Sequence, residues 1–154
     1  MFPPDFASSV QAELRSRFPL LASGEEAYRS DDVDVRGWRE LQSRVGSLVP
    51  QVSRMEAYQG VYVPSAPADI EQVPIANAAD PLHIGSVDAL VSELRAFATS
   101  ASLPTDDIEL MHLGTRYLEE EDLYDADLDV QTYVQLMLSA KQAAARRLPL
   151  WIVS

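Results

Sequence analysis

A run of acidic side chains between residues 119 and 129 is the part of the sequence best suited to chemistry. Its members are Glu119, Glu120, Glu121, Asp122, Asp125, Asp127 and Asp129. Carboxylate oxygens at alternate positions suit hard cations such as Ca²⁺ and Mg²⁺. An EF-hand loop from Asp125 would need Gly at its sixth position and Glu at its twelfth, where this chain has Val130 and Leu136. The run is therefore not an EF-hand, and a looser magnesium or calcium site on Glu119, Asp122 and Asp125 stays open.

Glu119 and Asp122 have a spacing similar to the second acidic pair of the all-helical nucleotide pyrophosphohydrolases. Members of that family bind Mg²⁺ through two acidic clusters, the first of which reads Glu-Glu-x-x-Glu. The nearest match begins at Glu25 and Glu26 and has Arg29 where the third acid is required. The resemblance implies a metal-dependent nucleotide or phosphoester hydrolase, and the missing acid speaks against it.

Tyr124 is flanked by Asp122 and Asp125. Burial of this Tyr within the fold is unfavourable because its charged neighbours resist removal from water. Tyr is frequent among the residues that dominate protein–protein binding. We therefore interpret Tyr124, Asp122, Asp125 and Asp127 as residues that bind a basic protein surface. One alternative is a Tyr124 ring that packs on a neighbouring helix with its hydroxyl in water. For the acids, the alternative is a solvated loop whose last Asp caps the following helix.

Other catalytic chemistry finds little support in the residue types. The chain has no Cys, which excludes disulfides, thiolate zinc sites, iron–sulfur clusters and thiol nucleophiles. Neither His83 nor His112 has a second His at metal-ligand spacing. There is no Gly-x-Ser-x-Gly motif to present a serine nucleophile. We predict no catalytic residue and no cofactor, apart from the open Mg²⁺ or Ca²⁺ site.

The charge of the chain is concentrated in one segment. The net charge is −12, and residues 105–129 carry ten acids against Arg116 alone. A negative field repels nucleic-acid phosphates and anionic lipid heads, so neither is expected as a partner. The sequence shows no signal peptide and no apolar run approaching the ~20 residues of a membrane helix. We expect a soluble cytoplasmic protein.

Apolar spacing predicts five to six amphipathic helices in a mainly α (α+β) fold. They fall near 5–18, 34–55, 86–98, 104–118 and 129–147, the second being one or two helices. In the second, the residues Trp38, Leu41, Val45, Leu48, Val52 and Met55 follow the heptad spacing of a coiled coil. Gly46 and Pro50 interrupt that stripe, which favours a kinked helix or two helices on a core over a homodimer.

Two later helices carry specific expectations. The segment 104–118 has one apolar stripe with Ile108 and Met111 and another with Leu110 and Leu113, so we expect a central helix. Lys141 falls on the buried side of the last helix, and its ammonium group should extend to the surface.

The segment 60–85 contains four Pro residues and is open to two interpretations. It holds either short edge strands at 61–63, 73–75 and 82–84 or an extended linker. A short strand at 150–153 should pair with 61–63 and form a small sheet beside the helices. We expect a single, layer-packed domain over 1–154, with 60–85 as the one candidate subdomain boundary.

These observations favour a non-enzymatic acidic module that binds a basic protein surface. An inhibitor or immunity protein, an adaptor and a chaperone all fit that description. The alternatives are a metal-dependent hydrolase that uses residues 119–129 and a structural homo-oligomer that uses the apolar stripe of residues 38–55.

Overall fold

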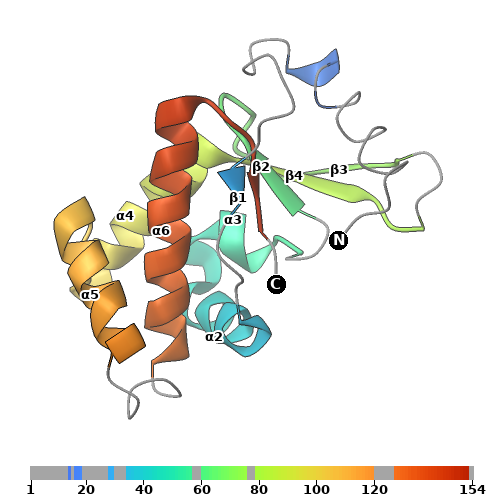
Figure 1. Cartoon of the computed structure of the whole chain (residues 1–154). Coiled ribbons are helices and arrows are strands. Elements are labelled where there is room, and N and C mark those ends of the chain that lie inside the picture. The colour runs from blue at the N-terminus through green and yellow to red at the C-terminus, as the bar shows by residue number, and fades with distance from the viewer. Residues whose placement is uncertain are drawn as a thin grey trace.

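A computed structural model describes residues 14, 16–18, 28–29, 34–56, 60–75, 79–119 and 127–152. Within them the fold is α+β, as predicted (Figure 1). The helices are α2 (Val35–Val45), α3 (Pro50–Ser53), α4 (Val87–Ala101), α5 (Asp107–Glu119) and α6 (Leu128–Arg146), with a 3-10 turn at Gly46–Leu48. The strands are β1 (Tyr28–Arg29), β2 (Gly60–Val63), β3 (Glu71–Val73), β4 (Leu82–Ser86) and β5 (Leu150–Trp151). The helix expected near 5–18 lies mostly outside the described residues.

Helix α6 is the central element of the helical part. It packs against α2, α4 and α5, and it leads through Leu148 and Pro149 into β5. Helix α5 lies at the outer edge of the molecule, with α6 between it and the strands (Figure 1). The prediction of a central helix at 104–118 was therefore wrong. None of the described helices has the length and apolar character needed to cross a membrane.

The sequence left open a kinked helix or two helices over residues 34–55, and the structure has two, α2 and α3. Asp34 caps α2 by accepting a hydrogen bond from the Gly37 N–H at 2.9 Å. Gly46 ends α2 with a φ of 50°, a left-handed value that a residue without a side chain adopts readily. The 3-10 turn then shifts the helical phase, so Val49 is buried and Leu48 is 58% exposed.

The apolar stripe of residues 38–55 is used within the fold. Trp38, Leu41, Val45, Val52 and Met55 all belong to the main core cluster. A homo-oligomer would consequently have to use another surface.

The five strands of the described chain form one sheet in the order β1-β5-β2-β4-β3. Strand β2 pairs antiparallel with β5, and Val61 lies opposite Trp151, which confirms the predicted pairing. It also pairs parallel with β4, which in turn pairs antiparallel with β3. The segment 60–85 therefore contains strands, and β4 is an interior strand of the sheet where an edge strand was expected. That 1–154 is a single domain stays a prediction.

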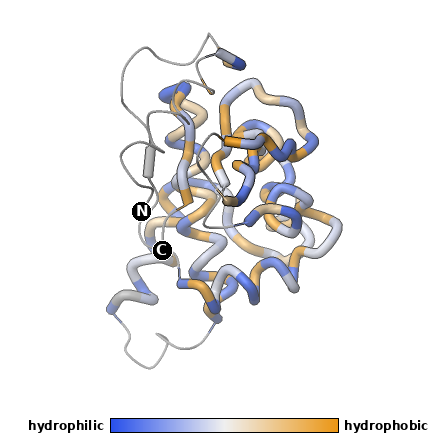
Figure 2. Tube along the Cα trace, turned by 90° about the vertical axis from the view of Figure 1, so that its right-hand side faces the viewer, coloured by the Kyte–Doolittle hydropathy of each residue, from blue (hydrophilic) through white to orange (hydrophobic). Residues whose placement is uncertain are grey.

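Apolar clusters form on both faces of this sheet. The main cluster joins Tyr62 and Leu150 to the helices, and a smaller one contains Val61, Val63 and Ile84 together with Leu14. Alternate residues of β2 thus enter different clusters, as the alternating direction of strand side chains requires. Figure 2 shows apolar and polar stretches alternating along the helices, as expected for helices with one buried side.

Two strand positions are Gly where α3 and the residues after it approach the sheet closely. A Cβ atom at Gly85 would come within 2.5 Å of Gln51 Oε1 and 2.9 Å of Met55 Cε. A Cβ atom at Gly60 would overlap the Met55 sulfur and lie 2.9 Å from the Glu56 carbonyl oxygen. A side chain at Gly85 would therefore force Gln51 and Met55 to shift, and one at Gly60 would force Met55 and Glu56 to shift.

Gln51 is fully buried on α3 and hydrogen-bonds in several directions. Its side-chain amide donates to the Ala68 carbonyl and accepts from the Ser86 N–H at 2.9 Å. Its carbonyl accepts from the Tyr62 hydroxyl at 2.6 Å, and its N–H donates to the Glu93 carboxylate at 3.1 Å. One residue thus connects α3, two strands, α4 and the loop after β2.

We predict that Gln51→Met lowers the free energy of unfolding by about 2 kcal/mol or more, because the buried Ser86 N–H loses its acceptor. Met has a similar shape, so the loss reports hydrogen bonding rather than volume. Urea denaturation measures it. The matched control Gln72→Met, at an exposed position of β3, should change stability by less than about 0.5 kcal/mol. Equal effects of the two changes would contradict the role of Gln51.

Glu93 is a partly buried carboxyl group on α4. Burial raises the pKa of Glu93, and the hydrogen bond from the Gln51 N–H acts in the opposite direction. The folded protein therefore holds this proton more tightly than the unfolded chain. The stabilisation is fully present below the ordinary pKa of 4.5 and is lost as the pH rises through the raised value.

Glu93→Gln should accordingly be more stable than the wild type at pH 7, with the difference disappearing below about pH 4. The Gln side chain can still accept the hydrogen bond from Gln51. Thermal melts over this pH range provide the measurement, with the exposed Glu56→Gln as the control. A pH-independent difference would rule out this explanation.

Candidate partner-binding surface

The acidic segment 119–129 joins α5 to α6. Glu119 is the exposed last residue of α5, and Asp127 is the exposed residue that precedes α6. The predicted residues Asp122, Tyr124 and Asp125 lie outside the described residues. The structure therefore describes the two ends of the predicted site and the helices that carry them.

Asp127 is held by a side chain of α5. The Tyr117 hydroxyl donates to its carboxylate at 3.4 Å, and the Asp127 backbone has a left-handed φ of 50°. Burial raises the pKa of Tyr117, and the negative charge of Asp127 raises it further. Asp127 occupies the position before α6 but its side chain makes no capping hydrogen bond. The expectation that an Asp side chain caps this helix is therefore not met.

Asp129 lies inside the first turn of α6 and is paired with an Arg from α2. The Arg44 guanidinium is 2.5 Å from the Asp129 carboxylate and 5.6 Å from the centre of the Phe97 ring on α4. Three helices thus meet at the beginning of α6. No local sequence signal could have identified this pair, because 85 positions separate its members.

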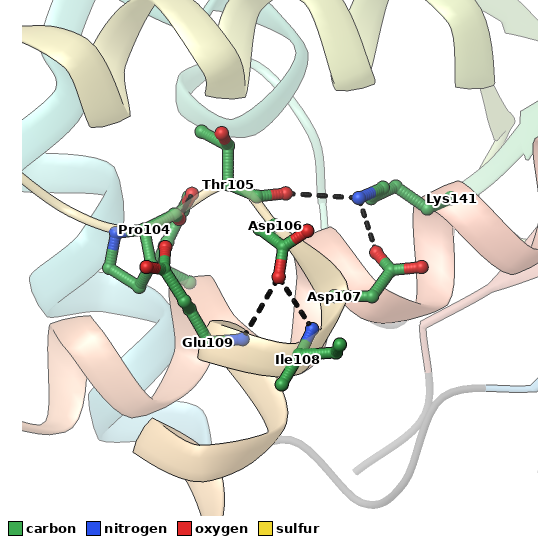
Figure 3. A network of polar contacts seen from close by, with 8 residues as sticks. Pro104, Thr105, Asp106, Asp107, Ile108, Glu109 and Lys141 are labelled. Carbon is green, nitrogen blue, oxygen red and sulfur yellow. Dashed lines mark hydrogen bonds and ion pairs between the residues drawn. The ribbon is translucent and has the colours of Figure 1, made fainter.

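A second set of contacts fixes the beginning of α5 (Figure 3). The Lys141 ammonium group donates to the Thr105 carbonyl at 2.9 Å and pairs with Asp107. Asp106 accepts hydrogen bonds from the N–H groups of Ile108 and Glu109 at 3.0 and 3.3 Å, which caps the helix. The predicted extension of Lys141 toward the surface thus ends in an ion pair.

A further contact holds the same loop from the interior. The buried Tyr133 of α6 donates its hydroxyl to the Pro104 carbonyl at 2.6 Å. Its ring lies edge-on to Phe97, with ring centroids 6.0 Å apart. The loop that enters α5 is therefore attached to α6 by two side chains.

Helix α5 buries one of its two apolar stripes. Leu110 and Tyr117 are buried, whereas Ile108 is 65% exposed and Met111 is 60% exposed. The two exposed residues stand one turn apart and belong to the same face of the helix. The sequence pattern identified both stripes but could not show which of them is covered.

The structure also places the residues considered for metal and acid–base chemistry. No three His, Asp or Glu side chains lie close enough to bind a metal ion in the part of the chain described. Of the predicted ligands, only Glu119 belongs to that part. His83 is buried in β4 with its Nδ1 atom unpaired, and His112 is exposed on α5.

Comparisons of the chain with protein-family models, curated proteins and solved structures give no significant match.

We predict that Lys141→Met loosens the beginning of α5, because the Asp107 ion pair and the Thr105 hydrogen bond are both lost. Amide hydrogen exchange should become faster over residues 110–114. The free energy of unfolding should fall by about 1 kcal/mol, since the pair is partly exposed. The neighbouring exposed change Gln142→Met is the control. Unchanged exchange in α5 would show that Lys141 does not anchor this helix.

Proposed function

We propose that this protein is a non-enzymatic acidic module that binds a basic protein surface. Its contact residues are Asp122, Asp125 and Asp127, with Tyr124 as the anchor. An inhibitor or immunity protein, an adaptor or a chaperone would each act in this way. Residues 105–129 carry most of the net negative charge of the chain, and this is the observation on which the proposal rests.

The described contacts support this role because they hold the helices on either side of the acidic segment. Tyr117 holds Asp127, and Arg44 pairs with Asp129. Lys141 and Tyr133 attach the start of α5 to α6. A charged segment carried by fixed helices loses less conformational entropy on binding than one carried by a loose tail.

A binding role also requires fewer specifically placed residues than a catalytic role. Complementary charge increases the association rate and the specificity of a complex, and one aromatic anchor can supply much of its affinity. A metal-dependent hydrolase would need a second group of ligands, and the sequence has Arg29 where the related motif requires an acid. We therefore favour binding over hydrolysis for the acidic segment.

The negative charge of the module also indicates which partners it would meet. A negative field disfavours nucleic acids and anionic membranes as partners and favours a cationic protein. We propose a cytoplasmic location and a single layer-packed domain on the basis of the sequence.

The test is a pull-down from host extract that compares three proteins at low and high salt. The first is the wild type, and the second carries Asp122→Asn, Asp125→Asn and Asp127→Asn. The third is a charge-matched control with Glu56→Gln, Asp69→Asn and Asp80→Asn, three exposed positions away from α5 and α6. We expect a basic partner that the wild type and the control retain at low salt and that the second protein loses at least about tenfold.

High salt should release the partner from the wild type, because screening weakens attraction between exposed charges. Tyr124→Phe and Tyr124→Ala then separate the hydroxyl from the ring, and the Ala change should cost more. Equal loss in the second protein and in the control would mean that only total charge matters. That result would overturn the proposed site.

A further inference from the structure

The exposed face of α5 has the pattern of a docking surface. Ile108, Met111, Thr115 and Glu119 follow one another at helical spacing, and all four are exposed. We call them the outer α5 face. Ile108 and Met111, at 65% and 60% exposure, are the two most exposed large apolar side chains among the described residues. Contiguous exposed apolar patches often mark binding sites, and Ile108 and Met111 are neighbours one turn apart on the same face.

The charges around this face select the kind of partner. The acids of helix α5 are Asp107, Glu109 and Glu119, and its one basic residue is Arg116. Asp107 is paired with Lys141, whereas Glu109 and Glu119 are exposed and leave the helix acidic toward a partner. The apolar pair stands near the start of the helix, and Glu119 at its end leads into the acidic segment. A complementary partner must therefore combine an apolar stripe with cationic residues beside it.

A second copy of the chain fits this surface poorly. Each copy has a net charge of −12, and two acidic helices placed face to face would repel each other. A cationic amphipathic helix meets both requirements, because its apolar residues recur at the spacing of Ile108 and Met111. The flexible side chain of Met111 can adapt to partners of different shape.

We propose that the outer α5 face binds a cationic amphipathic helix of the partner, with Ile108 and Met111 as its apolar contacts. The proposal rests on the function proposed above and extends the site from the acidic segment to α5. Attraction by the acids brings the partner to the surface, and the apolar pair selects a helix with an apolar stripe over any other cation.

The test uses two labelled peptides of about 18 residues made of Leu and Arg. One places Leu along a single helical face, and the other has the same composition in a scrambled order without such a face. Binding is followed through ¹³C-labelled methionine methyl signals, of which the chain has four. Met111 is the reporter, and the fully buried Met55 and Met137 are internal controls. Met111→Gln assigns the reporter signal.

We expect the amphipathic peptide to shift the Met111 signal and to leave those of Met55 and Met137 in place. Ile108→Gln should weaken its binding about tenfold or more, because the substitution removes an apolar contact without changing charge. Leu48→Gln is the matched control, since Leu48 is 58% exposed on another part of the surface, and it should bind as the wild type does. The scrambled peptide should bind more weakly, and its affinity should not change on Ile108→Gln.

Three results would overturn the proposal. The first is equal affinity for both peptides with an unmoved Met111 signal, and the second is absence of binding at low salt. The third is a Met111 signal that moves with protein concentration alone, which would identify a second copy as the occupant. In the first case, the proposed function would still hold if neutralising Asp122, Asp125 and Asp127 abolished the binding of both peptides. If those three substitutions left the affinity for the peptides unchanged, the result would count against that function.

Discussion

The buried amide of Gln51 is the contact on which the arrangement of helices and strands depends. Its side-chain oxygen and nitrogen, its N–H and its carbonyl each have a partner, and these partners come from four separate segments. Hydrogen bonds in an interior of low polarity are costly to leave unmade, so they fix the separation of the parts they join. Gly85 leaves room for the Gln51 side chain beside β4, and Gly60 leaves room for Met55, which follows α3.

Away from Gln51, two basic side chains connect the helices that flank the acidic segment. Arg44 joins α2 to the start of α6, and Lys141 joins α6 to the start of α5. Each pair also neutralises one acid in the region where the chain is most negative, which reduces the repulsion that concentrated charge imposes on a folded state. The same two cations therefore stabilise the fold and fix the starts of the two helices that flank the acidic segment.

The outer α5 face and the acidic segment are complementary parts of one proposed surface. The acids act over a long range, and their effect is weakened by salt, whereas Ile108 and Met111 act only on contact. A partner that is cationic but has no apolar stripe would be attracted by the acidic segment and would gain nothing from the outer α5 face. This division explains how a strongly acidic protein could still discriminate among basic partners.

The sequence by itself determined the local features: the helix starts at Asp34 and Ser86, the break between Gly46 and Pro50, and the short strands near residues 61 and 150. Each follows from a side chain acting on backbone within a few residues. Only the tertiary structure decided that β4 lies inside the sheet and that α5 lies at the edge. It also decided that Arg44 reaches Asp129 and that Ile108 and Met111 stay exposed. An apolar stripe shows that a helix face can be buried. Which faces are buried depends on contacts between residues far apart in the chain.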